Sequence, residues 1–303
     1  MGRVRVAGDV YARRARSRPV GYADRVRHQT SMTTTPDGLR LHQQTWLGDA
    51  PKAAIVLVHG YAEHSGRYEH VAERFTQAGY DVYTFDLRGH GRSEGKPRVY
   101  VRSIDEHTGD LERFLTSVRE RAGSLPLFLL GHSMGGAISA RFLVDGDHGL
   151  KGAILSAPAV LRAGLFGRPV EAFFLFIAGL VPRWHFPKLD DAKVSRDPEV
   201  VERYNNDPLI YRDGMPLGTA AAIVRSARYV DKNAGKIQLP IFIGHGTEDA
   251  LVNFIASERL HDRVGSQDKT LKLYPGLYHE ILNEPERDQV MQDMTDWLDA
   301  RVS

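Results

Sequence analysis

A serine lies between two glycines in a pattern that could support nucleophilic catalysis. Residues 131–135 read GHSMG, so Ser133 is the centre of a G-x-S-x-G pattern. An apolar run, Leu127–Leu130, directly precedes the pattern, and an apolar helical pattern begins just after it. In this context the glycines permit a tight turn that projects the hydroxyl, and the helix start brings free N–H groups close to any oxyanion. The sequence therefore predicts Ser133 as a nucleophile.

A serine hydroxyl is a poor nucleophile near neutral pH, so the reaction needs a base, and the base needs an orienting carboxylate. His279 lies five residues past the end of the last apolar run and shortly before the final helical pattern. This is where the base is expected when nucleophile, acid and base follow in that order along the chain. We therefore predict His279 as the base.

The acid is expected after the preceding apolar run. Residues 241–249 read IFIGHGTED and offer two carboxylates, Glu248 and Asp249. Asp249 is predicted because the 30 residues to the base leave room for one helix and one strand. Asp268 and Glu280 are interpreted as solvated charges, and His245 as part of a turn.

Two backbone N–H groups are predicted to hold the oxyanion. One belongs to Met134, which directly follows the nucleophile. The other belongs to Tyr61, in the loop after the apolar run 54–58, where Gly60 lets the backbone turn toward the reaction centre.

The elements that position these residues follow an alternating rhythm. From Leu39 onward short apolar runs alternate with helical patterns, which is typical of strands joined by crossover helices. The fold class predicted is α/β, with a mostly parallel central sheet flanked by helices. The predicted strands are 54–58, 82–85, 127–130, 153–155, 241–243 and 271–274, with amphipathic helices around 111–118 and 290–298.

The alternation stops between about residues 158 and 238, where helical patterns with scattered prolines replace it. An all-helical insertion at the carboxyl edge of the sheet would lie where open α/β sheets bind ligands. We predict that it forms a cap over the site.

Composition excludes several classes of protein. The 303 residues contain 40 Lys and Arg against 38 Asp and Glu, a net charge of +2, which is too balanced for binding nucleic acid through summed charge. There is no cysteine, which excludes a disulfide scaffold, a thiol nucleophile and a Cys-based metal site. Residues 279–283 (HEILN) lack the second histidine of a zinc motif, and residues 91–96 (GRSEGK) are one residue short of a phosphate-binding loop. No metal, cofactor or nucleic-acid partner is expected.

The charge is concentrated at the amino end. Residues 1–28 hold eight arginines against two acidic residues, and the rest of the chain holds 32 basic against 36 acidic residues. Residues 1–31 are interpreted as a disordered extension, with a transit peptide or a true start at Met32 as alternatives, and residues 32–303 as the folded domain. No transmembrane segment is expected, because the longest apolar stretch spans only 12 residues. No signal peptide is expected, because no apolar run of secretory length follows the amino-terminal arginines. A cytoplasmic location is expected.

Six segments together resemble the monoacylglycerol lipase family of the α/β-hydrolase superfamily. The resemblance runs from about Leu39 to Arg301 and includes the cap. It implies that Ser133, Asp249 and His279 form a catalytic triad and that the cap forms a tunnel for an acyl chain. The segments are 59–68 (HGYAEHSGRY), 88–95 (RGHGRSEG), 131–136 (GHSMGG), 195–200 (SRDPEV), 204–209 (YNNDPL) and 274–279 (YPGLYH).

The resemblance also implies a head-group site. Glu63, Arg67 and Tyr204 match positions near the glycerol in that family. Two positions depart from the pattern: Tyr61 replaces a small residue of vertebrate members, and Leu282 replaces a second histidine three places beyond the base.

The apolar stretch 170–181 allows two interpretations. Phe173, Phe174 and Ile177 at helical spacing are typical of an ordinary packed helix face. However, Phe and Leu fall on more than one face, as in a lid helix that admits an acyl chain and contacts lipid. An ordinary packed helix would bury these side chains, whereas a lid helix would expose part of its apolar surface.

The function predicted is hydrolysis of a monoacylglycerol to fatty acid and glycerol through an acyl-enzyme. A carboxylesterase or lysophospholipase with the same three residues is the alternative. A non-catalytic lipid-binding protein on the same fold is a further one. Acyl length, isomer preference, cap mobility and oligomeric state are left open by the sequence.

Overall fold

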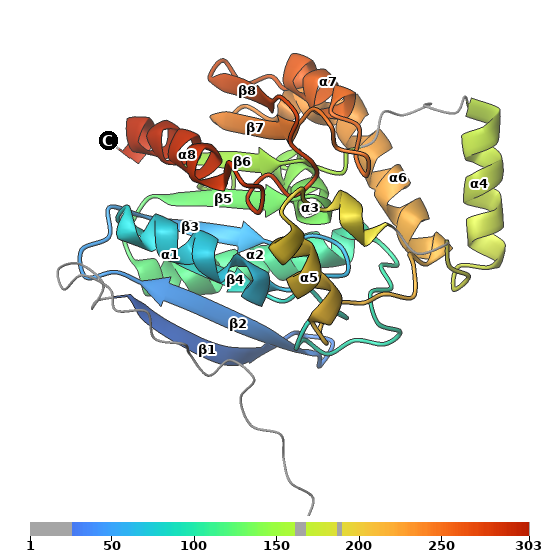
Figure 1. The fold of residues 1–303 in the computed structure, drawn as a ribbon, viewed down its shortest axis with the longest axis horizontal. Helices are drawn as coiled ribbons and strands as arrows, with labels where there is room; N and C mark the ends of the chain where they lie inside the picture. The colour runs from blue at the N-terminus through green and yellow to red at the C-terminus, as the bar shows by residue number, and fades with distance from the viewer. Residues whose placement is uncertain (1–25, 161–167, 187–189, 303) are drawn as a thin grey trace, which may run out of the picture.

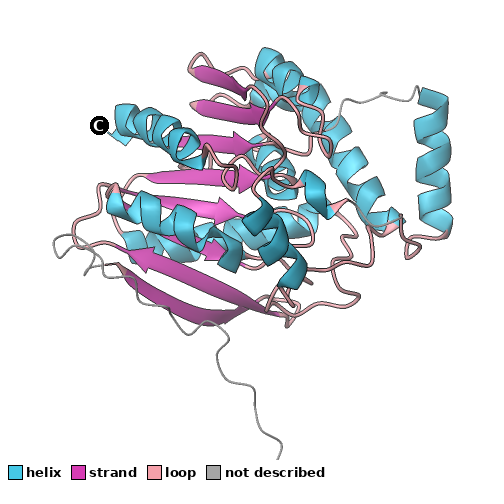
Figure 2. Cartoon of the chain, in the orientation of Figure 1, coloured by secondary structure: helices cyan, strands magenta, loops and turns pink. Residues whose placement is uncertain are grey.

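The computed structural model describes residues 26–160, 168–186 and 190–302. Its centre is a sheet of eight strands in the order β1-β2-β4-β3-β5-β6-β7-β8, with helices on both faces (Figures 1 and 2). The strands from β3 to β8 run parallel, whereas β2 is antiparallel to both of its neighbours. The predicted α/β class is therefore confirmed. The strands are β1 Arg27–Thr34, β2 Arg40–Leu47, β3 Ala53–Val58, β4 Tyr80–Phe85, β5 Leu127–His132, β6 Gly152–Ser156, β7 Ile241–Gly246 and β8 Lys269–Tyr274.

Both faces of the central strands are buried, which explains their continuous apolar runs. In β3, Val56 and Val58 face the core under α2 and α3, whereas Ile55 and Leu57 face the core under α1 and α8. Figure 1 shows α1 and α8 together on one face of the sheet. The helices of the two layers are α1 Glu69–Gln77, α2 Ile104–Ala122, α3 Met134–Leu143, α7 Ile255–Arg263 and α8 Arg287–Val302.

All six strands predicted from apolar runs are present, but the sequence did not indicate β1 and β2. Every residue of β1 is exposed, so this edge strand carries no apolar pattern. The predicted boundary after residue 31 is wrong, because β1 begins at Arg27 and pairs along its length with β2. Residues 27–31 therefore belong to the sheet, and residues 1–25 lie outside the described part of the chain.

The described residues between β6 and β7 form helices α4 (Arg168–Leu180), α5 (Pro198–Asn206) and α6 (Leu217–Asn233) and the short 3-10 helices η2 (Asp191–Lys193) and η3 (Ala234–Lys236). The helix α6 belongs partly to the body, because Ile223 and Val230 pack into the core that it shares with α3. Figure 1 shows α4 on the outer side of α6, away from the sheet. In the described ranges no helix is long and apolar enough to cross a membrane.

Candidate active site

Ser133 lies on the turn between β5 and α3 in a strained backbone conformation. Its φ is +53° and its ψ −117°, a region that residues with a side chain rarely adopt. The turn is possible because its flanking positions are glycines. A Cβ on Gly131 would meet Ser139 Oγ, and one on Gly135 would meet the carbonyl oxygen of Val58. The strain thus projects the Ser133 hydroxyl from the carboxyl edge of the sheet.

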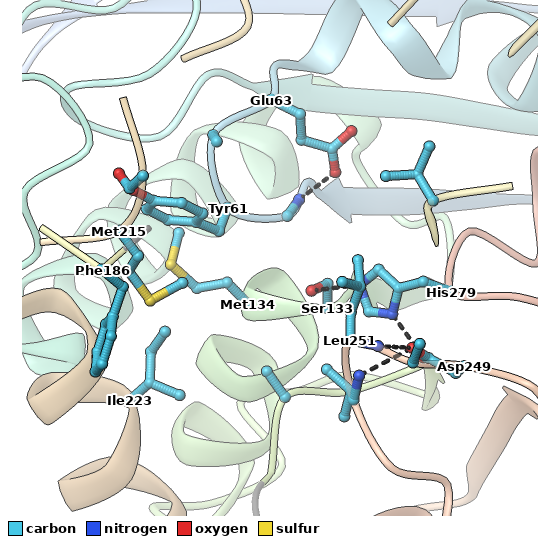
Figure 3. A pocket seen from close by; sticks show the side chains of 18 of the residues that line it. Tyr61, Glu63, Ser133, Met134, Phe186, Met215, Ile223, Asp249, Leu251 and His279 are labelled. Carbon is cyan, nitrogen blue, oxygen red and sulfur yellow. Dashed lines mark hydrogen bonds and ion pairs between the residues drawn. The ribbon is translucent and has the colours of Figure 1, made fainter. Parts of the chain in front are cut away.

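His279 comes from the loop between β8 and α8, and its ring points at the serine (Figure 3). Its Nε2 lies 2.9 Å from Ser133 Oγ, and its Nδ1 lies 2.6 Å from Asp249 Oδ2. An ionised carboxylate only accepts hydrogen bonds, so Nδ1 carries the proton. Nε2 is then free to accept the proton of the serine hydroxyl.

Asp249 follows β7 and has four hydrogen-bond partners. Its Oδ1 accepts the backbone N–H groups of Leu251 and Val252 at 2.8 and 2.9 Å, and its Oδ2 faces both His279 and His245. Burial raises the pKa of this carboxyl, but the charge of His279 and these hydrogen bonds outweigh burial and hold the pKa well below the ordinary value. The carboxylate is therefore charged and fixed in orientation.

The interpretation of His245 as part of a turn is wrong. It lies inside β7, is fully buried, and contacts Asp249 Oδ2 at 2.9 Å through Nε2 and Ser257 Oγ at 2.7 Å through Nδ1. A polar residue in an otherwise apolar strand was the available sequence signal.

The electrostatics of His279 suit a base. Burial lowers the pKa of His279, but the charge and hydrogen bond of Asp249, with the charges of Glu280 and Glu63, outweigh it and raise the pKa above the ordinary value. The neighbouring His132 shows the opposite result. Burial and the nearby His279 lower the pKa of His132 to about 4, so this second imidazole stays neutral.

The two predicted oxyanion donors flank Ser133. Met134 is the first residue of α3, so its N–H has no hydrogen-bond acceptor within the helix. Tyr61 follows β3, and both residues line the same cavity as Ser133 (Figure 3). Gly60, which directly precedes Tyr61, is required because a Cβ there would lie 2.7 Å from Glu63 Oε1 and 3.2 Å from Ser133 Cβ.

Of the three residues matched to a glycerol site, Glu63 and Tyr204 line the cavity, whereas Arg67 is not among its lining residues. The Arg67 guanidinium lies behind them, 4.8 Å from the centre of the Tyr204 ring. Its amino groups bind Glu63 and Glu280 at 2.6 to 2.7 Å.

Glu280 is buried, so its interpretation as a solvated charge is wrong. Only 5% of the residue is exposed, and it lines the cavity directly beside His279. The Arg67 guanidinium compensates its charge through two hydrogen bonds of 2.7 Å. No local pattern reveals this pairing, because the partners are 213 residues apart.

The cavity that contains Ser133 and His279 has a volume of about 830 Å³, within the range of ligand pockets. Figure 3 shows sulfur atoms and apolar side chains on the side away from Asp249. No group of three or more His, Asp or Glu residues in the described ranges could hold a metal ion. Apolar residues from the body and the insertion line the cavity: Met134, Phe174, Phe186, Met215, Ile223 and Leu251.

The chain is similar to known proteins over most of its length. A family model described as serine aminopeptidase, S33, matches residues 49–286. The monoacylglycerol lipase of Mycolicibacterium smegmatis is 40% identical over 262 residues, which cover 86% of this chain and 93% of that protein. The chain belongs to the monoacylglycerol lipase family.

Two further members of this family support the assignment. The monoglyceride lipase of Rattus norvegicus is 31% identical over 271 residues, covering 88% of this chain and 89% of that one. The crystal structure of the Paleococcus ferrophilus monoacylglycerol lipase superposes with a TM-score of 0.75 at 30% identity, covering 86% of this chain and 99% of that one. The α/β-hydrolase fold of the family is therefore shared.

The two departures from the monoacylglycerol lipase pattern have structural consequences. Tyr61 points its ring into the cavity, and its hydroxyl donates a 3.0 Å hydrogen bond to the carbonyl of Gly214 in the insertion. Leu282 packs in the core shared with α1 and α8, with 2% of its surface exposed. The first change links the turn after β3 to the cap, and the second replaces a polar side chain by a packed apolar one.

In α4 the aromatic residues divide between two directions. Phe174 lines the cavity, whereas Phe173 and Phe176 have 66% and 62% of their surface exposed. Ile177 is partly buried and is not among the residues that line the cavity. Leu180 extends the exposed stripe. Large apolar side chains therefore lie both on the outer surface of α4 and against the cavity.

Proposed function

We propose that this chain is a serine hydrolase that cleaves monoacylglycerol to fatty acid and glycerol through an acyl-enzyme. The observation that carries the proposal is the hydrogen-bonded array of Ser133, His279 and Asp249 beside an apolar cavity of about 830 Å³. Membership of the monoacylglycerol lipase family supports the choice of substrate.

In the first half-reaction, Ser133 Oγ attacks the ester carbonyl while His279 Nε2 takes its proton. Asp249 stabilises the imidazolium formed on His279, and the N–H groups of Tyr61 and Met134 hold the oxyanion. His279 then returns the proton to the glycerol oxygen as the bond to the acyl carbon breaks. The acyl chain stays esterified to Ser133 in the apolar part of the cavity.

In the second half-reaction a water molecule replaces glycerol. His279 takes a proton from this water, whose oxygen attacks the acyl carbon. The same two N–H groups hold the second oxyanion, and the proton returns to Ser133 Oγ as the fatty acid leaves.

The raised pKa of His279 predicts the pH dependence of the reaction. His279 accepts the serine proton only when it is neutral, so activity is lost as pH falls through the pKa of the folded protein. Because that pKa is raised from 6.5, the acidic limb of kcat/KM against pH is expected to have its midpoint above 6.5. A midpoint at or below 6.5 on a soluble short-chain ester would contradict the pairing of His279 with Asp249.

The charge of the cavity favours a neutral head group and disfavours the lysophospholipase alternative. Among the described lining residues, Arg212 is the only Lys or Arg. An anionic phosphate head group would therefore find a single basic lining residue to bind it, among several carboxylates of which Glu63 and Glu280 are already paired with Arg67. The acidic lining residues are Glu63, Glu171, Asp190, Asp191, Asp249 and Glu280.

Initial rates on four lipids of matched acyl length test the substrate. Mono-, di- and triacylglycerol and lysophosphatidate are compared in the same detergent. We expect kcat/KM to be greatest for monoacylglycerol and at least about tenfold lower for lysophosphatidate. A preference for lysophosphatidate would contradict the proposed substrate. Absence of hydrolysis, together with no labelling by a fluorophosphonate, would instead favour a lipid-binding protein.

We also propose that α4 touches a lipid surface. Val170, Phe173, Phe176 and Leu180 each have more than half of their surface exposed, as does Trp184 just beyond the helix. A cluster of large apolar side chains on the outer side of a helix marks an interaction surface. It lies on the helix whose Phe174 lines the cavity, so an acyl chain would pass from lipid to Ser133 along α4.

Two variants of α4 separate surface contact from cavity shape. The double variant Phe173→Ser with Phe176→Ser is expected to lower activity on emulsified long-chain monoacylglycerol by about tenfold, because apolar burial at the lipid is lost. Its activity on a soluble short-chain ester should stay within about twofold of the parent. Phe174→Ser is the matched comparison, since it changes the cavity and should affect both substrates. Equal losses on both substrates in the double variant would contradict lipid contact.

A further inference from the structure

A chain of buried charges joins the loop that carries His279 to the turn that carries Tyr61. The Glu280 carboxylate accepts two hydrogen bonds of 2.7 Å from Arg67 Nη1 and Nη2. Arg67 Nη1 also donates at 2.6 Å to Glu63 Oε2. One guanidinium therefore connects residues from two loops that meet only in the folded protein.

The other oxygen of Glu63 holds the turn itself. Glu63 Oε1 accepts a 2.6 Å hydrogen bond from the backbone N–H of Gly60 and a 2.7 Å hydrogen bond from the Tyr68 hydroxyl. The turn is strained, because Ala62 has a φ of +65°. A strained turn keeps its conformation only when the surrounding groups determine it, and the Glu63 carboxylate is such a group.

These three charged groups are almost completely removed from solvent. The side chains of Arg67, Glu63 and Glu280 are 9%, 4% and 6% exposed. Burial raises the pKa of Glu63, but the charge of Arg67, together with the hydrogen bond from Tyr68, outweighs burial and holds the pKa well below its ordinary value. When one of these buried charges is removed, water does not take its place, so each charged group depends on the group to which it is hydrogen-bonded.

The contacts of Arg67 argue against a direct contact between its side chain and the head group. Arg67 is absent from the lining of the cavity, and its Nη1 and Nη2 bind carboxylates. Its guanidinium lies instead between the residue after the base and the residue that holds Gly60. This position suits alignment of the two halves of the site.

We infer that Glu280 is a positioning residue which, through Arg67 and Glu63, fixes the Gly60–Tyr61 turn so that the Tyr61 N–H faces the oxyanion. This inference rests on the proposed function. Glu280 directly follows His279, so these linked charges also set the distance between the base and the oxyanion donor.

Glu280→Gln tests the inference because it removes one charge at constant size. Loss of a whole oxyanion donor lowers kcat by about 10² to 10³, so a displaced donor should lower kcat by about 10- to 100-fold. KM for a neutral short-chain ester should change less than about threefold. The rate at which a fluorophosphonate labels Ser133 should fall in parallel, since phosphonylation needs the same donors. Glu280→Asp, which keeps the charge, should restore part of the rate.

Glu284→Gln is the matched control. Glu284 is a buried carboxylate four residues along, and it binds Arg196 instead of Arg67. Its replacement should lower the melting temperature but leave kcat and the labelling rate within about twofold. If Glu280→Gln and Glu284→Gln have equal effects on kcat, Glu280 is only structural and the inference is wrong.

A double-variant cycle tests the path. If Glu280 acts through Glu63, the combined variant Glu280→Gln with Glu63→Gln should lose little more activity than the single variant with the larger loss. Losses that multiply would overturn the path. Should Glu280→Gln fail to fold, Arg67→Lys replaces it, because it keeps the charge but breaks the two-pronged contact. A kcat of Arg67→Lys within twofold of the parent would overturn the inference.

The two levels of proposal fail in different ways. If the unchanged protein neither hydrolyses esters nor reacts with the fluorophosphonate, the proposed function is wrong. If it does both and Glu280→Gln behaves as Glu284→Gln does, only the positioning role is wrong.

Discussion

Replacing Ser133 with alanine is expected to lower kcat on any ester by about six orders of magnitude, equivalent to about 8 kcal/mol of barrier. The reason is the loss of Oγ, the atom 2.9 Å from His279 Nε2. Without it no acyl-enzyme can form, and only the oxyanion donors and the cavity remain. Steady-state hydrolysis of a soluble ester and fluorophosphonate labelling both measure the effect.

Ser139→Ala is the matched control for this experiment. Ser139 lies on α3, is completely buried, and does not line the cavity. Its replacement also removes one hydroxyl from the same helix and should leave kcat within about twofold. A Ser133→Ala protein that keeps even a tenth of the parent rate would end the proposed mechanism.

Replacing Asp249 with asparagine is expected to lower kcat by about 10⁴-fold, the second largest effect. The two backbone N–H groups of Leu251 and Val252 require an acceptor at Oδ1. The asparagine amide must therefore turn its oxygen toward them and its NH₂ toward His279 Nδ1. His279 would then hold its proton on Nε2, facing Ser133, and could not act as a base.

The pH profile gives an independent measurement on Asp249→Asn. The carboxylate charge is the main factor that raises the pKa of His279, so the acidic limb should move to lower pH in the variant. Asp231→Asn is the control, because Asp231 pairs with Arg259 and lies outside the active-site cavity. An Asp249→Asn variant within tenfold of the parent kcat would show that another group orients His279.

Local patterns predicted those strands and helices whose burial is visible within a few consecutive residues. The strands β3, β5 and β7 are buried on both faces and therefore appear as continuous apolar runs. The edge strand β1 has no such pattern, since all of its residues are exposed. Its place in the sheet follows from pairing with β2, which a local pattern does not report.

The same distinction applies to the direction of side chains. Helical spacing marked the aromatic residues of α4 but not which of them point outward. Phe173 and Phe174 are neighbours in sequence, yet the first is exposed and the second lines the cavity. The difference arises from where α4 lies relative to α6 and the cavity, which is a property of the assembled fold.

The residue types and their spacing predicted the chemistry of the candidate site. The prediction needs only local patterns: a glycine-flanked serine after one strand, an aspartate after β7 and a histidine after β8. These residues come together because the carboxyl ends of parallel strands meet at one edge of a sheet. The contacts that hold the site, in contrast, form only when the chain folds. Glu280 and Arg67 are 213 residues apart, and neither burial nor the 2.7 Å pairing can be read from their neighbours in the chain. The physical reason is that a buried charge is stabilised by the partner that folding brings to it, and that partner is chosen by topology rather than by local sequence.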